Sequence, residues 1–291
     1  IRSGEILAIL GENGSGKTTL MNMLAGIYFP DEGEILVNGQ NVTIASPKDA
    51  FECGIGMIHQ HFKLVDVFTA AENIILGLEG QQKLDLKTVA ANEICDKYGF
   101  VIDPYKKVYN MSVSEKQTVE IVKVLYRGAD ILILDEPTAV LTPQETDRLF
   151  EVMRNMKADG KAMVIITHKL NEVMEISDRV AIMRKGEYIA TLNTAETNEQ
   201  QLTDLMVGHK VDLKIERPET VFDKPLLEIR DLVIKNDDGA VAIDHVNFYI
   251  RGGEMLGVAG ISGCGQRELC EAIAGLRKIA GGQMIHNGTD L

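Results

Sequence analysis

The order of apolar and polar residues predicts strands that alternate with helices. Buried strands are expected where short apolar runs occur, at Glu5–Leu10, Ile131–Leu134 and Ala162–Thr167. Helices are expected where apolar residues recur three or four positions apart, in a segment from about Gly16 and in Ala70–Leu78, Leu86–Tyr98, Ser114–Tyr126 and Thr142–Ala158. Strands that alternate with helices favour an α/β fold with a parallel sheet.

Turn and capping residues place some of these elements more closely. Asn38-Gly39 is typical of a two-residue hairpin turn, and it follows a short apolar run at Glu34–Val37. Thr142-Pro143-Gln144-Glu145 combines a capping hydroxyl, a proline at the first helical position and a glutamate that can cap back. The pattern between about 64 and 128 is helical, which predicts a helical insert inside the α/β domain.

The chain also matches itself. Arg2–Val42 aligns with Arg251–Leu291 without a gap at an offset of 249, so that Gly11, Gly14 and Gly16 fall on Gly260, Gly263 and Gly265. A match at one fixed offset indicates a duplicated domain. We therefore expect a first domain at 1–210, a linker at 211–224 and the truncated start of a second copy at 225–291.

That second copy is expected to open with an antiparallel hairpin. Its strands are predicted at Leu226–Lys235 and Ala242–Ile250, around an Asp238-Gly239 turn. Because the repeat stops where the first copy has reached only Val42, and because the chain begins without methionine, we interpret the sequence as a fragment.

Composition narrows the class of protein. Apolar residues make up 45% of the 291 positions and charged residues 25%, which excludes a disordered chain. The net charge of −13 and the lack of a basic stripe argue against a nucleic-acid partner. No apolar run approaches the roughly 20 residues that a bilayer requires, so any membrane role is expected to depend on a partner. The four cysteines match no metal or disulfide spacing and are predicted to be reduced, buried thiols (Cys53, Cys95, Cys264 and Cys270).

The strongest chemical signal is the segment Gly11–Thr18, which reads GENGSGKT. Two glycines bracketing four residues, followed by Lys and Thr, are typical of a phosphate-binding P-loop. Glycines allow the backbone N–H groups to turn towards phosphate oxygens, and the following helix presents its positive end to the same anion. Lys17 is then expected to reach the β- and γ-phosphates, and the Thr18 hydroxyl to bind Mg²⁺.

A second signal is the apolar strand Ile131–Leu134, which ends in Asp135 and Glu136. Two adjacent acids at the end of a buried strand are unfavourable unless a cation lies nearby. We expect Asp135 to hold the Mg²⁺ of a nucleotide through water. Glu136 is expected to orient the attacking water and to accept its proton.

With these motifs in place, the sequence resembles the ATPase subunit of ATP-binding cassette transporters along its whole length. Gln60 matches the loop glutamine of that family, and His168 matches its switch histidine. Met111–Glu115, which reads MSVSE, stands where the family carries its Leu-Ser-Gly-Gly-Gln signature. Ala139–Thr142 matches the loop after the second acid, with Thr142 where Asp is usual.

The resemblance implies a P-loop NTPase core with an antiparallel β subdomain and an inserted helical subdomain. It also implies ATP and Mg²⁺ as ligands, with Mg²⁺ at Thr18, Asp135 and Gln60, and catalysis by Glu136, His168, Gln60 and Lys17. Nucleotide binding is assigned to the P-loop and the residue that follows it (Gly11, Asn13, Gly14, Ser15, Gly16, Lys17, Thr18 and Thr19). The signature residues Ser112, Val113, Ser114 and Glu115 are expected to act in trans, on the nucleotide of another cassette.

Within that family, the chain resembles the tandem ATPases of simple-sugar and nucleoside importers. The stretches that carry this resemblance are Gly54–Gly77, Met111–Glu115 and Met206-Val207-Gly208. The implied partners are membrane permease subunits, indirectly an extracytoplasmic substrate-binding protein, and a second cassette in cis or in trans. The implied location is the cytoplasmic face of a bacterial membrane. Whether the cargo is a nucleoside or a sugar stays open.

The second copy departs from the P-loop pattern. The repeat places Gln266 at the position of Lys17 and Arg267 at that of Thr18, while Gly263 and Gly265 are kept. Arg267 restores a positive charge but cannot bind Mg²⁺. Ser114 replaces a signature glycine, and in a head-to-tail pair of cassettes both defects would fall in one composite site. We therefore expect one hydrolytic and one degenerate site in the full-length protein.

Three other interpretations are weaker. A soluble tandem cassette that acts on ribosomes or nucleic acid is disfavoured by the acidic charge, the short linker and Gln266. A nucleotide sensor without catalysis is disfavoured by Glu136 and His168. A metal site of His59, His61 and Cys53 has poor ligand spacing.

Overall fold

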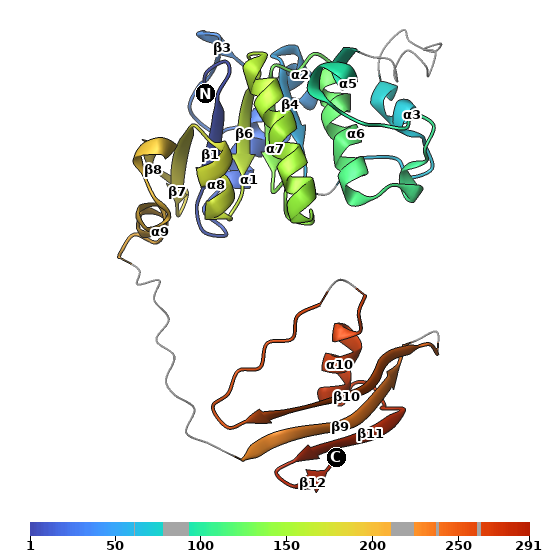
Figure 1. The fold of residues 1–291 in the computed structure, drawn as a ribbon. Coiled ribbons are helices and arrows are strands. Elements are labelled where there is room, and N and C mark those ends of the chain that lie inside the picture. The colour runs from blue at the N-terminus through green and yellow to red at the C-terminus, as the bar shows by residue number, and fades with distance from the viewer. Residues whose placement is uncertain (61, 78–92, 211–223, 237–238, 261–262) are drawn as a thin grey trace. The chain divides into compact units, whose positions relative to one another are not determined.

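The computed structural model describes residues 1–60, 62–77, 93–210, 224–236, 239–260 and 263–291 (Figure 1). The chain divides into two compact units, which are described separately: unit 1 is Ile1–Leu213 and unit 2 is Lys214–Leu291. Parts of four predicted segments lie outside the described residues, namely Leu78 of the predicted helix Ala70–Leu78, 86–92 of the predicted helix Leu86–Tyr98, 211–223 of the predicted linker, and Asp238 of the predicted turn. His61 lies outside them as well.

Unit 1 is built on a six-stranded sheet with the order β4-β5-β6-β1-β7-β8. The strands are β1 (Ile6–Leu10), β4 (Ile55–Ile58), β5 (Ile131–Asp135), β6 (Ala162–Ile166), β7 (Arg179–Arg184) and β8 (Glu187–Asn193). Every neighbouring pair from β4 to β7 is parallel, and β8 joins the edge antiparallel to β7. The predicted parallel sheet is therefore confirmed. Because the strands are parallel, β1, β5 and β6 end at the same edge of the sheet.

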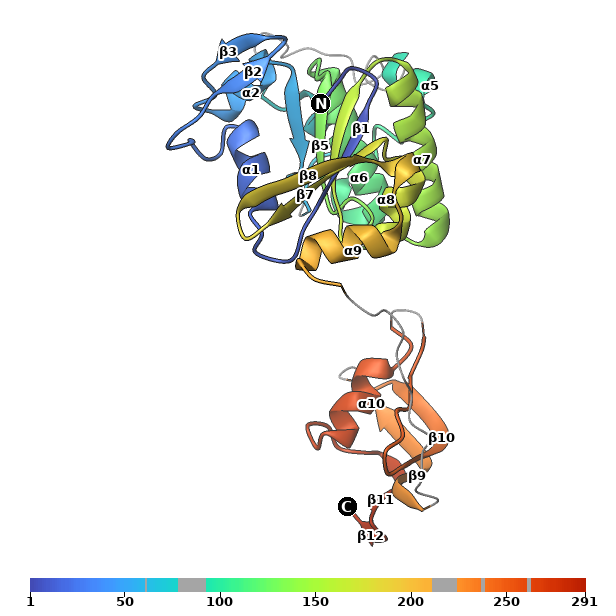
Figure 2. The same ribbon diagram turned by 90° about the vertical axis from the view of Figure 1, so that its left-hand side faces the viewer.

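Helices cover both faces of this sheet (Figure 2). The helices α6 (Val113–Tyr126), α7 (Pro143–Ala158) and α8 (Leu170–Ile176) pack on one face, and α1 (Lys17–Leu24) and α2 (Pro47–Glu52) on the other. The start of α7 is as predicted: the Thr142 hydroxyl caps it, Pro143 is its first residue, and the Glu145 carboxylate bonds back to the Thr142 amide.

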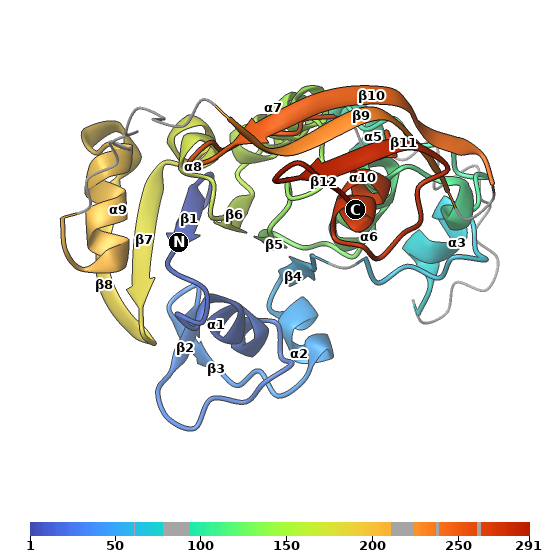
Figure 3. The same ribbon diagram turned by 90° about the horizontal axis from the view of Figure 1, so that it is seen from below.

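The strip of α7 that faces the sheet is apolar. It consists of Leu149, Phe150, Met153 and Met156, all buried in the larger core cluster. The helix α9 (Glu199–Val207) contacts β7 (Figure 3) and ends at Gly208, whose φ of 89° only glycine adopts easily. None of the described helices combines the length and the apolar character needed to cross a membrane.

Helical segments lie between β4 and β5, where the pattern predicts them. They are α3 (Ala70–Ile75), α5 (Glu93–Tyr98), a 3₁₀ turn at Val108–Asn110, and α6. Buried residues of α3 and α6, among them Ala71, Ile74 and Val122, form a core cluster of their own. The predicted end of α3 at Leu78 is wrong: the backbone leaves the helix at Leu76, with ψ of 122°, and Gly77 has φ of 84°.

Unit 1 also contains the predicted two-residue hairpin. The strands β2 (Ile35–Val37) and β3 (Gln40–Val42) pair antiparallel, and Asn38 and Gly39 have φ of 52° and 76°. Positive φ at both positions is the signature of a type I′ turn. The hairpin is confirmed.

Unit 2 is an antiparallel sheet with one helix against it. The strands are β9 (Pro225–Lys235), β10 (Val241–Arg251), β11 (Gly281–His286) and β12 (Thr289–Asp290), in the order β10-β9-β11-β12. The helix α10 (Gln266–Ile273) buries Leu269 and Ala272 against Ile229 and Met284 of the sheet. The pairing of β9 with β10 confirms the antiparallel hairpin that was predicted for these residues.

One segment of unit 2 differs from its repeat counterpart. Residues 255–259 align with β1, but they form no strand, and the side chain of Met255 is fully exposed. In unit 1 the same positions are buried because β1 lies between two parallel neighbours, β6 and β7. The described part of unit 2 contains no such parallel neighbours. Apolar sequence alone is therefore not enough to make this strand.

The predicted burial of the cysteines is correct only in part. All four thiols are free; Cys95 is buried and Cys53 is half-buried. Cys264 and Cys270 are exposed, which corrects the prediction. Cys270 lies on α10, which has the sheet on one side only within the described residues, whereas Cys264 lies in the loop before this helix.

Candidate functional site

The glycine loop between β1 and α1 forms the centre of the candidate site. Gly14 and Gly16 have φ of 81° and 91°, a region that glycine enters without strain, and Gly16 precedes the first residue of α1. The Lys17 ammonium donates to the carbonyl oxygens of Gly11 at 2.8 Å and Glu12 at 2.9 Å. The loop thus holds its one cation over the start of the helix, where the helix dipole also favours an anion.

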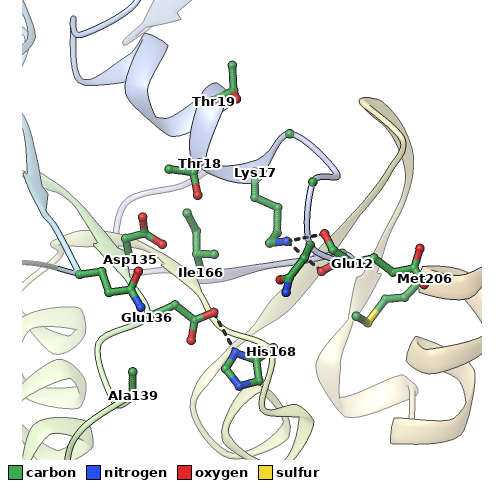
Figure 4. A pocket seen from close by; sticks show the side chains of 15 residues that line it. Glu12, Lys17, Thr18, Thr19, Asp135, Glu136, Ala139, Ile166, His168 and Met206 are labelled. Atoms are coloured by element: carbon green, nitrogen blue, oxygen red, sulfur yellow. Dashed lines mark hydrogen bonds and ion pairs between the residues drawn. The ribbon is translucent and has the colours of Figure 1, made fainter.

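The two predicted acids lie at the carboxyl end of β5. Glu136 has φ of 49°, and its amide donates to the carbonyl of Ile166 at 2.8 Å, which ties the end of β5 to the end of β6. One carboxylate oxygen, Oε1, contacts Nδ1 of His168 at 3.0 Å (Figure 4). The other oxygen, Oε2, is buried and has no hydrogen-bond partner in the described protein. A buried acceptor left unpaired is unfavourable, so this oxygen fits a site that a water or a ligand completes.

Burial changes the electrostatics of the same residues. Burial raises the pKa of Asp135, the neighbouring Glu136 raises it further, and His59 and Lys17 partly offset the shift. Burial also lowers the pKa of Lys17, against the attraction of Glu136 and Asp135. In both residues burial removes water from the charged group and so disfavours its charged form. A divalent cation beside Asp135 and an anion beside Lys17 would each favour the charged form.

These groups line one cavity of about 770 Å³. Its walls come from the glycine loop and α1, from the loop after β4, and from the ends of β5 and β6, and Figure 4 shows Lys17, Asp135, Glu136 and His168 around it. The sequence-predicted residues in the lining are Gly11, Asn13, Gly14, Gly16, Lys17, Thr18, Thr19, Gln60, Asp135, Glu136 and His168. The volume is of the size that ligand sites occupy.

Ser15 is the one member of the predicted loop set that does not line this cavity. Its residue is 2% exposed, and its hydroxyl lies 3.3 Å from the Lys17 ammonium, beneath the loop. Its side chain therefore supports the loop from below.

Four lining residues were not predicted from the sequence: Glu12, Ala139, Ile166 and Met206. Met206 is the least expected, because it comes from α9, close to the end of unit 1 (Figure 4). The sequence does mark Met206-Val207-Gly208 as a distinctive segment, but nothing in its pattern places it beside the glycine loop. Contacts between α9 and β7 bring it there.

The signature segment lies elsewhere. Ser112 caps α6, and Glu115 completes the capping box, with its carboxylate 2.7 Å from the Lys106 ammonium. Ser114 and Glu115 line a separate cavity of about 310 Å³ together with Gly99–Val101 and the start of α7. Neither Ser112 nor Val113 is in the lining of the glycine-loop cavity. Within unit 1, the structure therefore does not bring the predicted signature residues to the P-loop.

The second glycine loop keeps its backbone but not its side chains. Gly263 and Gly265 have φ of 84° and 92°, almost the angles of Gly14 and Gly16. The Gln266 amide donates to the carbonyl of Val258 at 3.3 Å, and Arg267 forms an ion pair with Glu271 at 2.7 Å on its own helix. Ile261 and Ser262 of this loop lie outside the described residues.

The chain is similar in sequence to proteins of known family. Residues 1–139 match the model of the family described as "ABC transporter". The chain is 47% identical over 292 residues to the nucleoside import ATP-binding protein NupA of Lactococcus lactis subsp. cremoris, with 99% of the chain and 58% of NupA covered. It is 40% identical over 323 residues to the glucose import ATP-binding protein TsgD13 of Haloferax volcanii, with 100% of the chain and 59% of TsgD13 covered.

The fold has relatives among solved structures as well. The structure of cbiO1 from Clostridium perfringens, part of the ABC transporter complex cbiONQ, matches with a TM-score of 0.58 and 29% identity. The match covers 72% of this chain and 84% of cbiO1. The chain spans a little more than half the length of the curated relatives that it matches.

Proposed function

We propose, on the premise that residues 1–139 belong to the ABC transporter family as an ATP-binding cassette, that this chain binds ATP with Mg²⁺ in the unit 1 cavity and hydrolyses it to drive an importer. One observation carries the proposal. The loop cation Lys17, the paired acids Asp135 and Glu136, and His168 line a single cavity although they are spread over 152 positions from 17 to 168.

The cavity suits a magnesium triphosphate. Lys17 and the amides of the glycine loop hold the phosphates, Asn13 and Thr19 complete the loop set, and His168 contacts the γ-phosphate. Mg²⁺, held by Thr18, Asp135 and Gln60, would neutralise charge on the phosphate oxygens. Its fit rests on Asp135, which is half-buried beside Glu136 with only partial compensation from His59 and Lys17.

Glu136 is placed to act on the attacking water. Its free Oε2 atom is the acceptor available for a water proton, while its Oε1 atom is already engaged by His168 at 3.0 Å. We assign Glu136 as the general base, and Gln60 as the residue that helps to orient the water. Because the imidazole and the carboxylate contact each other, His168 also helps to hold Glu136 in place.

We further propose that the full-length protein has two cassettes in tandem, with one competent and one degenerate site. Support comes from the second glycine loop, where Gln266 is turned to a backbone carbonyl and Arg267 to Glu271. In a head-to-tail pair, Ser114 and the rest of the Met111–Glu115 signature would face this weak loop. The intact loop of unit 1 would then receive the signature of the second cassette.

The same proposal includes the domain plan. A first nucleotide-binding domain spans 1–210, with its helical insert at about 64–128; a linker spans 211–224, and a second, degenerate domain begins at 225. Both glycine loops precede helices that start 249 positions apart, at Lys17 and Gln266, which supports the duplication.

The cargo is proposed to be a nucleoside or a simple sugar, and the identities favour the nucleoside, at 47% to NupA against 40% to TsgD13. The proposed partners are permease subunits, a substrate-binding protein that acts through them, and a second cassette, with no nucleic acid. The proposed place of work is the cytoplasmic face of the cell membrane. Co-purification with a permease supports this assignment, and co-purification with ribosomes contradicts it.

Binding and turnover are tested separately. Purified protein is expected to bind ATP in a Mg²⁺-dependent way, and Lys17→Ala is expected to lose that affinity. Glu136→Gln is expected to keep binding and to lose steady-state hydrolysis in the full-length protein. Undiminished affinity in Lys17→Ala contradicts the site, and substantial turnover in Glu136→Gln contradicts the asymmetry of the two sites.

The 291-residue chain gives a further test. It has no second signature within its sequence, so turnover requires two copies that lend Met111–Glu115 to each other. Its hydrolysis rate is then expected to rise with the square of protein concentration. A rate that rises linearly contradicts pairing of copies.

A further inference from the structure

A buried polar network lies directly behind the site and takes no part in the chemistry assigned above. It consists of Thr138, Lys169 and Glu172. Thr138 is fully buried and Glu172 is 6% exposed. The Thr138 hydroxyl donates to Glu172 Oε2 at 2.5 Å, and the Lys169 ammonium contacts Glu172 Oε1 at 2.9 Å. A buried carboxylate with two partners of this kind is strongly constrained.

The network joins the two loops that carry the reacting groups. Thr138 is two residues after Glu136, in the turn that follows β5, and Lys169 directly follows His168, in the turn that follows β6. The Lys169 ammonium crosses from one turn to the other, where it donates to the Thr138 carbonyl at 2.9 Å. The network therefore fixes the distance between the two turns.

The turn after β5 is also held from its other side. The buried amide of Gln117, on α6, donates to the carbonyl of Pro137 at 2.7 Å. The turn is thus fixed between the helix that begins at the signature and the loop that carries His168. Both contacts fall within two residues of Glu136 along the backbone.

The reacting groups depend on this support. The His168 side chain is 68% exposed, and its contact with Glu136 is the one that orients it. Glu136 itself has φ of 49°, a conformation that is strained for a non-glycine residue and persists only where the surroundings enforce it. The network supplies such enforcement on the side of the turn that faces away from the cavity.

We propose that Lys169, acting with Thr138 and Glu172, is a positioning residue that holds His168 and Glu136 in register for ATP hydrolysis. The proposal rests on the function proposed above, because it assigns no new chemistry and touches no nucleotide: none of the three residues lines the cavity. The alternative is that the three residues only stabilise the start of α8, where Lys169 is the capping position.

A matched ion pair on the same helix separates the two possibilities. Arg154, on α7, contacts Glu175, on α8, at 2.9 Å, and both side chains are 50% exposed. Arg154→Ala removes a contact between α8 and its neighbour without touching either turn. Lys169→Met removes the crossing between the turns, and Lys169→Arg keeps a cation there.

The first measurement compares kcat with Mg-ATP affinity in each variant. It uses the same protein whose wild-type ATPase activity tests the proposed function. Lys169→Met is expected to lower kcat about tenfold to a hundredfold, the range that follows from displacing a reacting group by about 1 Å. Its Mg-ATP affinity is expected to stay within about twofold of the wild type. Lys169→Arg is expected to recover most of the rate, and Arg154→Ala to leave it unchanged.

The second measurement separates positioning from general stability. In a His168→Ala background, adding Lys169→Met is expected to lower the rate by a smaller factor than it does in the wild type, because one of the two groups that it positions is already gone. An additive loss overturns the proposal, as does a wild-type rate in Lys169→Met or an equal loss in Arg154→Ala. Double-mutant cycles of this kind isolate the coupling between two residues.

A third measurement does not depend on turnover. The ring C–H resonances of His168 in carbon–proton NMR, identified by their loss in His168→Ala, are expected to shift in Lys169→Met and to stay in place in Arg154→Ala. If the wild type has no ATPase, the proposed function fails, while this spectrum still decides whether the network positions His168. Unchanged resonances in Lys169→Met overturn the inference.

Discussion

Gly11→Ala is the most specific test of the glycine loop, because the structure predicts how the added methyl group acts. A Cβ at Gly11 would lie 2.3 Å from the carbonyl oxygen of Met183 and 2.4 Å from the Ser15 hydroxyl oxygen. Neither neighbour can easily move. Met183 belongs to β7, which pairs on both sides within the sheet, and Ser15 is 2% exposed beneath the loop.

The size of the effect follows from those contacts. Non-bonded carbon and oxygen atoms do not approach to 2.3 Å, so the loop must shift by about 1 Å to accept the methyl group. Overpacking of this kind costs about 1–3 kcal/mol. The shift also moves the Gly11 carbonyl, which accepts from the Lys17 ammonium at 2.8 Å. We therefore expect Mg-ATP affinity to fall about tenfold to a hundredfold.

Gly26→Ala is the matched control. A Cβ at Gly26 would lie 2.2 Å from the Ser46 carbonyl oxygen, and its φ of 71° adds backbone strain, so the variant is at least as destabilised, but Gly26 does not line the cavity. Both variants are expected to lower Tm, and only Gly11→Ala to weaken binding when affinity is measured by calorimetry well below both transitions. Wild-type affinity in Gly11→Ala refutes the reasoning, and an equal loss in Gly26→Ala shows that general stability is responsible.

Three further predictions concern charge and capping in unit 1. Arg179→Ala leaves the buried Glu5 carboxylate without its partner, and we expect it to lower the free energy of unfolding by about 3 kcal/mol near neutral pH, measured by urea titration. The hydrogen bond from Arg179 lowers the pKa of Glu5, so this stabilisation is present above the ordinary carboxyl pKa of 4.5 and is lost as the pH falls through the pKa of Glu5 in the folded protein. If the difference in unfolding free energy between Arg179→Ala and the wild type stays constant down to acid unfolding, the pairing is contradicted. Asp135→Asn removes a carboxylate whose pKa is raised by burial, so without nucleotide the variant is expected to have a higher Tm than the wild type, by a margin that grows as the pH rises above the ordinary aspartate pKa of 3.8. The same variant is expected to lose the dependence of ATP affinity on Mg²⁺, and an unchanged Mg²⁺ dependence counts against a role of Asp135 at the metal. Thr142→Ala removes the cap of α7 and is expected to cost about 1 kcal/mol of stability without changing ATP affinity, with Thr142→Ser as the control that restores the cap.

Several elements of unit 1 could be predicted because their causes are local. The hairpin at Asn38-Gly39 follows from two residues that accept positive φ, and the start of α7 follows from Thr142, Pro143 and Glu145. The end of α3 could not be placed, because the apolar pattern continues past Ile75 while the backbone turns at Leu76 and Gly77.

The segment before the second glycine loop shows the limit of local pattern most directly. Residues 255–259 carry the same apolar pattern as β1, but only β1 becomes a strand. A parallel strand is stabilised by hydrogen bonds to neighbours distant in sequence, and β1 has β6 and β7. Periodicity predicts that a segment can be a strand; pairing decides whether it is.

By itself, the sequence determined the chemistry that this protein can carry: a glycine loop with its lysine, two acids at the end of an apolar strand, and the order of these motifs along the chain. The tertiary structure decided which groups meet. It placed Met206 beside the loop, left the predicted signature residues outside the cavity, and joined Thr138, Lys169 and Glu172 behind Glu136 and His168. The physical reason is that residue type and spacing report only on neighbours in sequence. The cavity forms where parallel strands from distant segments end at one edge of a sheet, and that edge exists only after folding.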